Sequence, residues 1–148
     1  MTSGPCKGGA YLLILRLPRP MTIEVGALGG IDFPKGIYAY SGSALRSLES
    51  RVMRHFLSQK KAHWHIDRLR AKAVPIEALV MRGQDDLECL INEMVGRMEG
   101  SIPFAPGFGC SDCTCLTHLH RLDRGCLVRL EGFFPERLLP IGGCESLL

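Results

Sequence analysis

The chain of 148 residues contains no apolar run that approaches the roughly 18 residues needed for a membrane-spanning helix. Residues 1–7 lack the charged start and apolar stretch of a secretory signal peptide. The sequence also shows no internal repeat and no low-complexity tract. These absences argue against membrane-spanning, secreted and repeat-array proteins, so we expect a cytoplasmic protein with no membrane partner.

A strong excess of charge of one sign is missing as well. The formal net charge is +3, which is too small to indicate nucleic-acid binding by itself. Charged residues make up 22% of the chain and hydrophobic residues 46%, as in an ordinary globular protein. We expect residues 1–148 to form a single domain that is long enough for a proper core.

Acidic residues are scarce in residues 46–72, where only Glu49 and Asp67 oppose eight basic side chains. A basic segment of this kind suits a phosphate backbone, although solvated helix faces would explain it equally well. The candidate nucleic-acid-binding residues in and beside this segment are Ser43, Arg46, Arg54, Lys60 and Lys61.

Cysteine is present in an odd number, seven, without an export signal, which makes reduced thiols the default. A metal site is the competing explanation, because residues 110–120 carry enough soft ligands for tetrahedral zinc. These ligands are Cys110, Cys113, Cys115, His118 and His120, and the first four form the candidate zinc set. The gap between Cys113 and Cys115 is tighter than in common zinc sites. Zinc and an ordered loop of reduced thiols therefore both stay open.

Apolar and alternating runs predict three strands in the first part of the chain. Residues 10–17 form an apolar run, residues 22–25 alternate, and residues 36–40 make the third strand. Their short connections predict an antiparallel meander. Residues 41–43 (Ser-Gly-Ser) are predicted as a turn that caps the following helix.

Helical periodicity follows this turn. The apolar positions recur at helical spacing and would form one buried stripe. Arg51 and His55 are four residues apart, so they lie together on one flank of the stripe. The stripe consists of Leu45, Leu48, Val52, Met53, Phe56 and Leu57.

The second half of the chain contains two more predicted helices. One begins at residue 65 and runs to 72, a strand follows over residues 75–81, and the clearest helix starts at residues 85–86. Glu88 lies at the edge of the apolar stripe of that last helix. Periodicity then fails, and residues 103–118 are predicted to be a long, ordered loop that carries function.

Each of these polar side chains alone has an ordinary structural explanation. Together, a strand tyrosine, a Tyr-x-Gly turn, an Arg-x-x-x-His helix and a later glutamate supply the parts of a site that cleaves phosphodiesters. A carboxylate can hold a divalent cation that activates water. An arginine stabilises charge on phosphoryl oxygens, and a tyrosine or histidine can move a proton.

In this combination the chain resembles the GIY-YIG nuclease superfamily. Members have a short antiparallel sheet with two motifs, a helix with Arg-x-x-x-His and a later helix with a metal-binding glutamate. The first motif resembles residues 9–11 (Gly-Ala-Tyr), and the second resembles residues 40–42 (Tyr-Ser-Gly). The helix pair matches Arg51 and His55, and the glutamate matches Glu88.

The similarity is greatest to the small Uri-type endonucleases, which share further segments. This chain has their Lys-Gly-x-Tyr-x-Tyr-x-Gly-Ser-Ala, His-Trp-His-Ile-Asp, Glu-Cys and Gly-Phe-Gly-x-Ser-Asp-Cys-x-Cys-x-x-His-Leu patterns. They occupy residues 35–44, 63–67, 88–89 and 107–119. The resemblance covers about residues 8–120 and leaves residues 121–148 as a C-terminal extension.

The resemblance implies an α/β (α+β) fold with a small, mainly antiparallel sheet of three to four strands flanked by helices. The two motifs must lie on neighbouring strands, which is why a literal Gly-Ile-Tyr at residues 36–38 is not taken as the first motif. The spacing between the motifs is longer than in typical members. An elaborated hairpin over residues 19–35 is therefore expected.

The activity that the resemblance implies is cleavage of DNA with Mg²⁺ or Mn²⁺ bound by Glu88. Arg51 would grip the scissile phosphate, and the tyrosines with His55 would position or deprotonate water. The full set of implied catalytic residues is Tyr11, Tyr40, Arg51, His55 and either His63 or His65. Two other classes stay open: a nucleic-acid-binding module that cleaves nothing, and a zinc- or thiol-based regulatory protein centred on residues 110–120.

Overall fold

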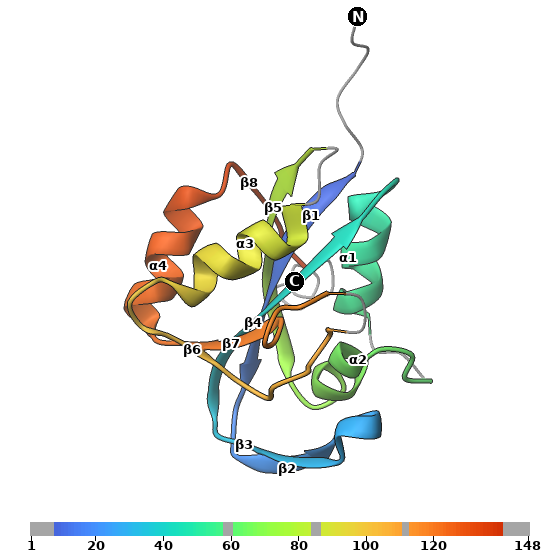
Figure 1. Ribbon diagram of the computed structural model, residues 1–148. Helices are drawn as coiled ribbons and strands as arrows, with labels where there is room; N and C mark the ends of the chain where they lie inside the picture. The colour runs from blue at the N-terminus through green and yellow to red at the C-terminus, as the bar shows by residue number, and fades with distance from the viewer. Residues whose placement is uncertain (1–7, 58–60, 84–86, 111–112, 141–148) are drawn as a thin grey trace, which may run out of the picture.

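A six-stranded sheet forms the centre of the computed structural model (Figure 1), which describes residues 8–57, 61–83, 87–110 and 113–140. The strand order is β6-β7-β4-β1-β5-β8, and all neighbouring strands are antiparallel. An antiparallel sheet flanked by helices is thus confirmed. The strands are β1 (Gly9–Leu17), β4 (Gly36–Ala44), β5 (Val74–Arg82), β6 (Ser101–Pro103), β7 (Leu119–Leu122) and β8 (Glu136–Leu138).

Helices cover both faces of the sheet (Figure 1). The helices are α1 (Leu48–Phe56), α2 (His65–Arg70), α3 (Leu87–Gly96) and α4 (Arg124–Phe133). Alternate residues of β1 serve the two faces: Leu13 packs with the core under α1 and α2, and Leu12 with the core under α3 and α4. Among the described residues, no helix is long and apolar enough to cross a membrane.

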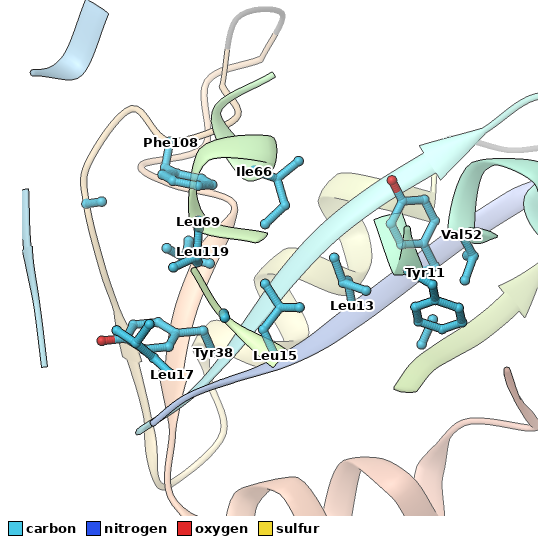
Figure 2. Close-up of a cluster of buried hydrophobic side chains, with 14 of the residues drawn as sticks. Tyr11, Leu13, Leu15, Leu17, Tyr38, Val52, Ile66, Leu69, Phe108 and Leu119 are labelled. Atoms are coloured by element: carbon cyan, nitrogen blue, oxygen red, sulfur yellow. The ribbon is translucent and has the colours of Figure 1, made fainter. Parts of the chain in front are cut away.

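The core on the α1 and α2 side is the larger of the two. Leu13 and Leu15 of β1 lie on the same side of the sheet as Ile66 and Leu69 of α2 (Figure 2). Phe108, from the long segment before β7, is fully buried in this cluster. Phe108 therefore anchors the described residues around it, which were predicted as part of an ordered loop, in the core.

The predicted meander is wrong, because the second strand leaves the main sheet. β2 (Met21–Glu24) pairs with β3 (Gly30–Phe33) in a separate two-stranded sheet, joined by the 3₁₀ helix η1 (Gly26–Leu28). β1 pairs directly with β4 instead. The hairpin expected over residues 19–35 is confirmed, and it places the two motifs on neighbouring strands.

The sheet is larger than the three to four strands that were expected. β6, β7 and β8 have only three or four residues each, too few for an alternating pattern to show. Cys126 and Leu130 of α4 are fully buried in the second core, and β8 pairs with β5. Residues 121–140, treated as an extension in the sequence, therefore complete the sheet and one of its faces.

The predicted turn at residues 41–43 is also wrong. β4 continues through it to Ala44, paired with β1 along its whole length. The cap of α1 is Ser47, whose hydroxyl accepts a hydrogen bond from the backbone N–H of Ser50. Ser43 therefore lies on a strand.

One buried carboxylate joins α1 to α2. Both carboxylate oxygens of Asp67 accept hydrogen bonds from Arg54 of α1, at 2.8 and 3.0 Å. Oδ2 also accepts the backbone N–H groups of His63 and Trp64, at 2.8 and 2.9 Å. Burial favours the neutral acid, but these hydrogen bonds outweigh it and lower the pKa of Asp67. Asp67 thus fixes the entry to α2, where Trp64 lies.

We expect Asp67→Asn to lower the free energy of unfolding by about 2 kcal/mol at neutral pH, because an amide cannot accept the same set of donors. The native pKa of Asp67 is depressed, so its stabilisation is present above the unfolded-state value and is lost as pH falls through the native one. Urea denaturation of both proteins should thus show a difference that shrinks below about pH 4. A difference that stays constant down to low pH would contradict this account.

Candidate functional site

A cavity of about 360 Å³ lies where β4 runs past the end of β7. β7 pairs with residues 37–40 of β4, and the backbone N–H of Ser41 donates to the His118 carbonyl just before β7. The residues of β4 after Ser41 lie at an open edge of the sheet in the described part of the chain. Side chains from both faces meet at this edge. The cavity, called the cleft below, is lined by Tyr11, Tyr40, Gly42, Ser43, Arg51, His63, Trp64, His65, Glu88 and Gly109.

The cross-strand pair Tyr11 and Gly42 forms the floor of the cleft. A Cβ atom at Gly42 would lie 2.3 Å from the Tyr11 hydroxyl oxygen and 2.4 Å from its Cζ. A side chain at this position would therefore displace the buried tyrosine ring. This contact gives a physical reason for the glycine of the Tyr-x-Gly motif.

His55 lies behind Tyr11, outside the lining of the cleft. The Tyr11 hydroxyl and His55 Nε2 are 2.7 Å apart, and both side chains are buried. Burial is the main reason why the pKa of His55 falls to about 4 and why the pKa of Tyr11 is raised well above its usual value. At neutral pH the pair is a neutral phenol hydrogen-bonded to a neutral imidazole.

Tyr40 is the second phenol of the cleft. Its ring contacts His55 and Phe108, with centroids 6.1 Å away in each case. Burial, followed by the charge of Glu88, raises the pKa of Tyr40. Tyr38 lies on the same face of β4, but its hydroxyl donates to the Pro34 carbonyl away from the cleft.

Arg51 reaches the cleft from α1, where it contacts Ser43, Trp64 and Tyr11. Its Nη1 donates to the Ser43 carbonyl at 3.0 Å, and its guanidinium carbon lies 4.8 Å from the centre of the Trp64 ring. A guanidinium stacked on an indole keeps its charge, and its N–H groups can still bind an anion. Arg51 is thus placed as a cation at the wall of the cleft.

Glu88 enters the cleft from α3, on the opposite face of the sheet from Arg51. Its Oε1 accepts from the Ser43 hydroxyl at 2.6 Å, and its Oε2 lies 2.8 Å from His118 Nδ1. Burial alone would raise the pKa of Glu88, but hydrogen bonds from His118 and Ser43 lower it. The carboxylate is ionised at neutral pH, and 24% of its side chain is exposed.

His63 and His65 both line the cleft. His65 Nδ1 accepts the backbone N–H of Gly109 at 3.0 Å, so this ring is fixed to the loop before β7. His63 is exposed at the rim. The structure therefore brings together Tyr11, Tyr40, Arg51, Glu88 and both histidines, while His55 supports Tyr11 from behind.

A second group of ligating side chains lies next to Glu88. Cys89, Cys113, Cys115 and His118 place their ligand atoms within 4.8 Å of one another, and this group could hold a metal ion such as zinc. The predicted ligand set was wrong in one member, because Cys110 does not belong to it. Its Sγ lies beside Cys113 and donates to the Phe108 carbonyl at 3.4 Å.

Ligand spacing within the loop does not reveal Cys89, because Cys89 comes from α3 before that loop. The signal that could have found it was the Glu-Cys pair at residues 88–89, which the family resemblance already contained. His120, the other candidate in the loop region, is outside the group. It is buried against Gly96 of α3, and burial lowers its pKa to about 4.

The candidate nucleic-acid-binding residues have different surroundings. Arg54 binds Asp67, and Ser43 donates to Glu88. Arg46 is exposed and lines a second cavity of about 490 Å³ together with Arg51 and Arg54. Lys61 is exposed, and Lys60 lies outside the described residues.

Comparison of the sequence with known protein families identifies the family of this chain. A family model described as a domain of unknown function, DUF123, matches residues 10–132. The chain belongs to the DUF123 family. The matched stretch contains every residue that lines the cleft and all four members of the cysteine-histidine group. No curated protein and no solved structure matches the chain.

In this DUF123 domain we expect Gly42→Ala to lower the free energy of unfolding by about 1 to 3 kcal/mol, because the added methyl overlaps the Tyr11 ring. Gly132→Ala is the matched control. It adds a methyl on α4 where no heavy atom lies within 4 Å. Chemical denaturation should leave that control unchanged or slightly more stable. Equal stabilities of the two variants would show that Tyr11 does not need the space at Gly42.

Proposed function

We propose that this DUF123 domain is a divalent-metal-dependent endonuclease that hydrolyses phosphodiester bonds in DNA. The observation that carries the proposal is the meeting of Tyr11, Tyr40, Arg51 and Glu88 in one cleft, although they come from β1, β4, α1 and α3. The resemblance of the motifs to the GIY-YIG nucleases supports it. An ionised carboxylate, a fixed guanidinium and two phenols are the side chains that such a reaction needs.

The cleft suits Mg²⁺ or Mn²⁺ through Glu88. Its ionised carboxylate is a hard oxygen ligand, and each oxygen keeps a lone pair beyond the one used by Ser43 or His118. Mg²⁺ is commonly held by one or two carboxylates, with water and substrate phosphate completing the shell. When bound, such an ion would neutralise phosphate charge and lower the pKa of a bound water.

Arg51 would bind the scissile phosphate. Its contacts with the Ser43 carbonyl and the Trp64 ring leave further guanidinium N–H groups for phosphate oxygens. Because Trp64 is fixed through its backbone N–H to Asp67, the guanidinium is held in place before substrate arrives. A preorganised cation stabilises transition-state charge without a reorganisation cost.

Tyr11 would orient the attacking water. With His55 Nε2 as acceptor of the Tyr11 proton, the hydroxyl oxygen turns its remaining lone pairs toward the cleft. Tyr40 would hydrogen-bond the phosphate or the water as a neutral phenol, because burial keeps its proton on. His63 and His65 line the cleft, and one of them would protonate the leaving oxygen. His55 is in this scheme a positioning residue.

The second cavity supports a path for the DNA backbone. It is lined by Arg46, Arg51 and Arg54, and Arg51 also lines the cleft, so the two cavities meet at this side chain. Arginines along such a path would neutralise phosphates beside the scissile one. A nucleic-acid-binding module without chemistry would use the same surface, and the cleavage assay separates the two functions.

The decisive assay is cleavage of labelled duplex, branched and single-stranded DNA in Mg²⁺ and in Mn²⁺. We expect the unmodified protein to cut, and Glu88→Gln and Arg51→Ala each to lower the rate by about a hundredfold or more. Glu93→Gln is the control, because Glu93 is an exposed acid of the same helix that pairs with Arg97. It should cut normally.

Two results would count against the nuclease. If the unmodified protein binds every substrate and cuts none, the domain is a binding module. If Glu88→Gln cuts as fast as the unmodified protein, the carboxylate does not hold the catalytic ion. Zinc content should be measured in each variant, because Glu88 also contacts His118 of the neighbouring group.

For the DNA path, we expect Arg46→Ala to weaken binding of all DNA sequences to a similar extent and to reduce the slope of log affinity against log salt by about one. Arg124→Ala is the control, since Arg124 is an exposed arginine on α4. Fluorescence anisotropy over a salt series measures both slopes. An unchanged slope for Arg46→Ala would show that the backbone does not pass over the second cavity.

A further inference from the structure

We infer that Cys89, Cys113, Cys115 and His118 bind a structural Zn²⁺ ion that fastens residues 113–118 to α3. The inference does not depend on the proposed nuclease chemistry, although His118 also contacts Glu88 of the cleft. The four ligand atoms lie within 4.8 Å of one another. His118 Nε2 is 4.0 Å from Cys89 Sγ and 3.1 Å from Cys113 Sγ. Ligands around tetrahedral zinc are about 3.5 to 3.8 Å apart, so small shifts would complete the geometry.

The orientation of His118 is the second observation that points to a metal. The side chain is fully buried, and its Nδ1 lies 2.8 Å from Glu88 Oε2 and 3.1 Å from the Ser41 carbonyl. An imidazole whose Nδ1–H is held by a carboxylate or carbonyl presents its Nε2 lone pair to a metal, as most zinc-bound histidines do. Here Nε2 faces the thiols.

The chemistry of the group selects the ion. Three thiolates and one imidazole form a soft ligand set that suits zinc and disfavours Mg²⁺. Four protein ligands leave no open position, which is the arrangement of a structural rather than a catalytic zinc site. Zinc would take the place of the protons on the thiols and on His118 Nε2, which are released when the ion binds.

The position of the site explains what the ion would do. Cys113, Cys115 and His118 come from the segment before β7, and Cys89 comes from the first turn of α3. The same segment carries Phe108 in the core and Gly109 in the wall of the cleft. A bound ion would therefore tie this segment to the helix that holds Glu88.

The test begins with the metal content of the full chain, purified in the presence of a reductant without added chelator. We expect about one zinc per chain in the unmodified protein. Cys89→Ser and Cys113→Ser should lose the ion, and Cys110→Ser, the matched control, should keep it. Elemental analysis of each sample gives the ratio.

A variant that fails to fold would also lose zinc, so a second measurement uses the unmodified protein. Alkylation followed by peptide mass mapping should find Cys89, Cys113 and Cys115 protected until a chelator is added. Cys110 should react at the same rate before and after chelation. Protection of these three thiols does not depend on any substitution.

The inference is overturned if the unmodified protein contains no zinc and takes up none when Zn²⁺ is titrated into the reduced protein. It is also overturned if Cys110→Ser loses the ion while Cys89→Ser keeps it. Neither measurement involves DNA. A chain that binds zinc but never cuts DNA would uphold this site and refute the nuclease, and the opposite result would do the reverse.

Discussion

The register between β1 and β4 is the constraint on which the candidate site depends. It sets Tyr11 directly opposite Gly42, with the tyrosine ring in the space that a side chain would need. A slip of one residue would turn Tyr11 to the opposite face and place a serine across from it. The hydrogen bond between Tyr11 and His55 would then be lost, and the floor of the cleft with it. The first motif (residues 9–11) and the second motif (residues 40–42) therefore both depend on the same pairing between β1 and β4.

The open edge of β4 is the second requirement. Arg51 lies on one face of the sheet and Glu88 comes from the helix on the other, so a continuous sheet would separate them. They meet because the pairing of β4 with β7 and the residue before it ends at Ser41. The Ser43 side chain then contacts Glu88, while its carbonyl accepts from Arg51. The short length of β7 is thus a feature of the site, and it is also why sequence periodicity did not reveal that strand.

Local sequence patterns predicted the longer strands and helices correctly. They failed where the pairing with another strand determines the structure. The strand at residues 75–81 and the helix beginning at residue 65 are confirmed as β5 and α2. Residues 41–43 were predicted as a turn because Ser-Gly-Ser suits a cap, but the pairing with β1 keeps them extended. Cys89 was absent from the predicted zinc ligands for a related reason. The spacing of residues within one loop does not indicate which helix contacts that loop.

Glu88 and Cys89 are adjacent in the sequence, so the two proposed metal sites would lie within one small region. Successive helix residues point about 100° apart, so Glu88 faces the cleft while Cys89 faces the thiols. Carboxylate oxygen and water favour Mg²⁺ or Mn²⁺, whereas thiolates favour zinc, so the ligand type would keep the two proposed ions apart. His118 contacts both sites through its two ring nitrogens. A change that moves this imidazole would therefore disturb the Glu88 carboxylate and the thiol group together.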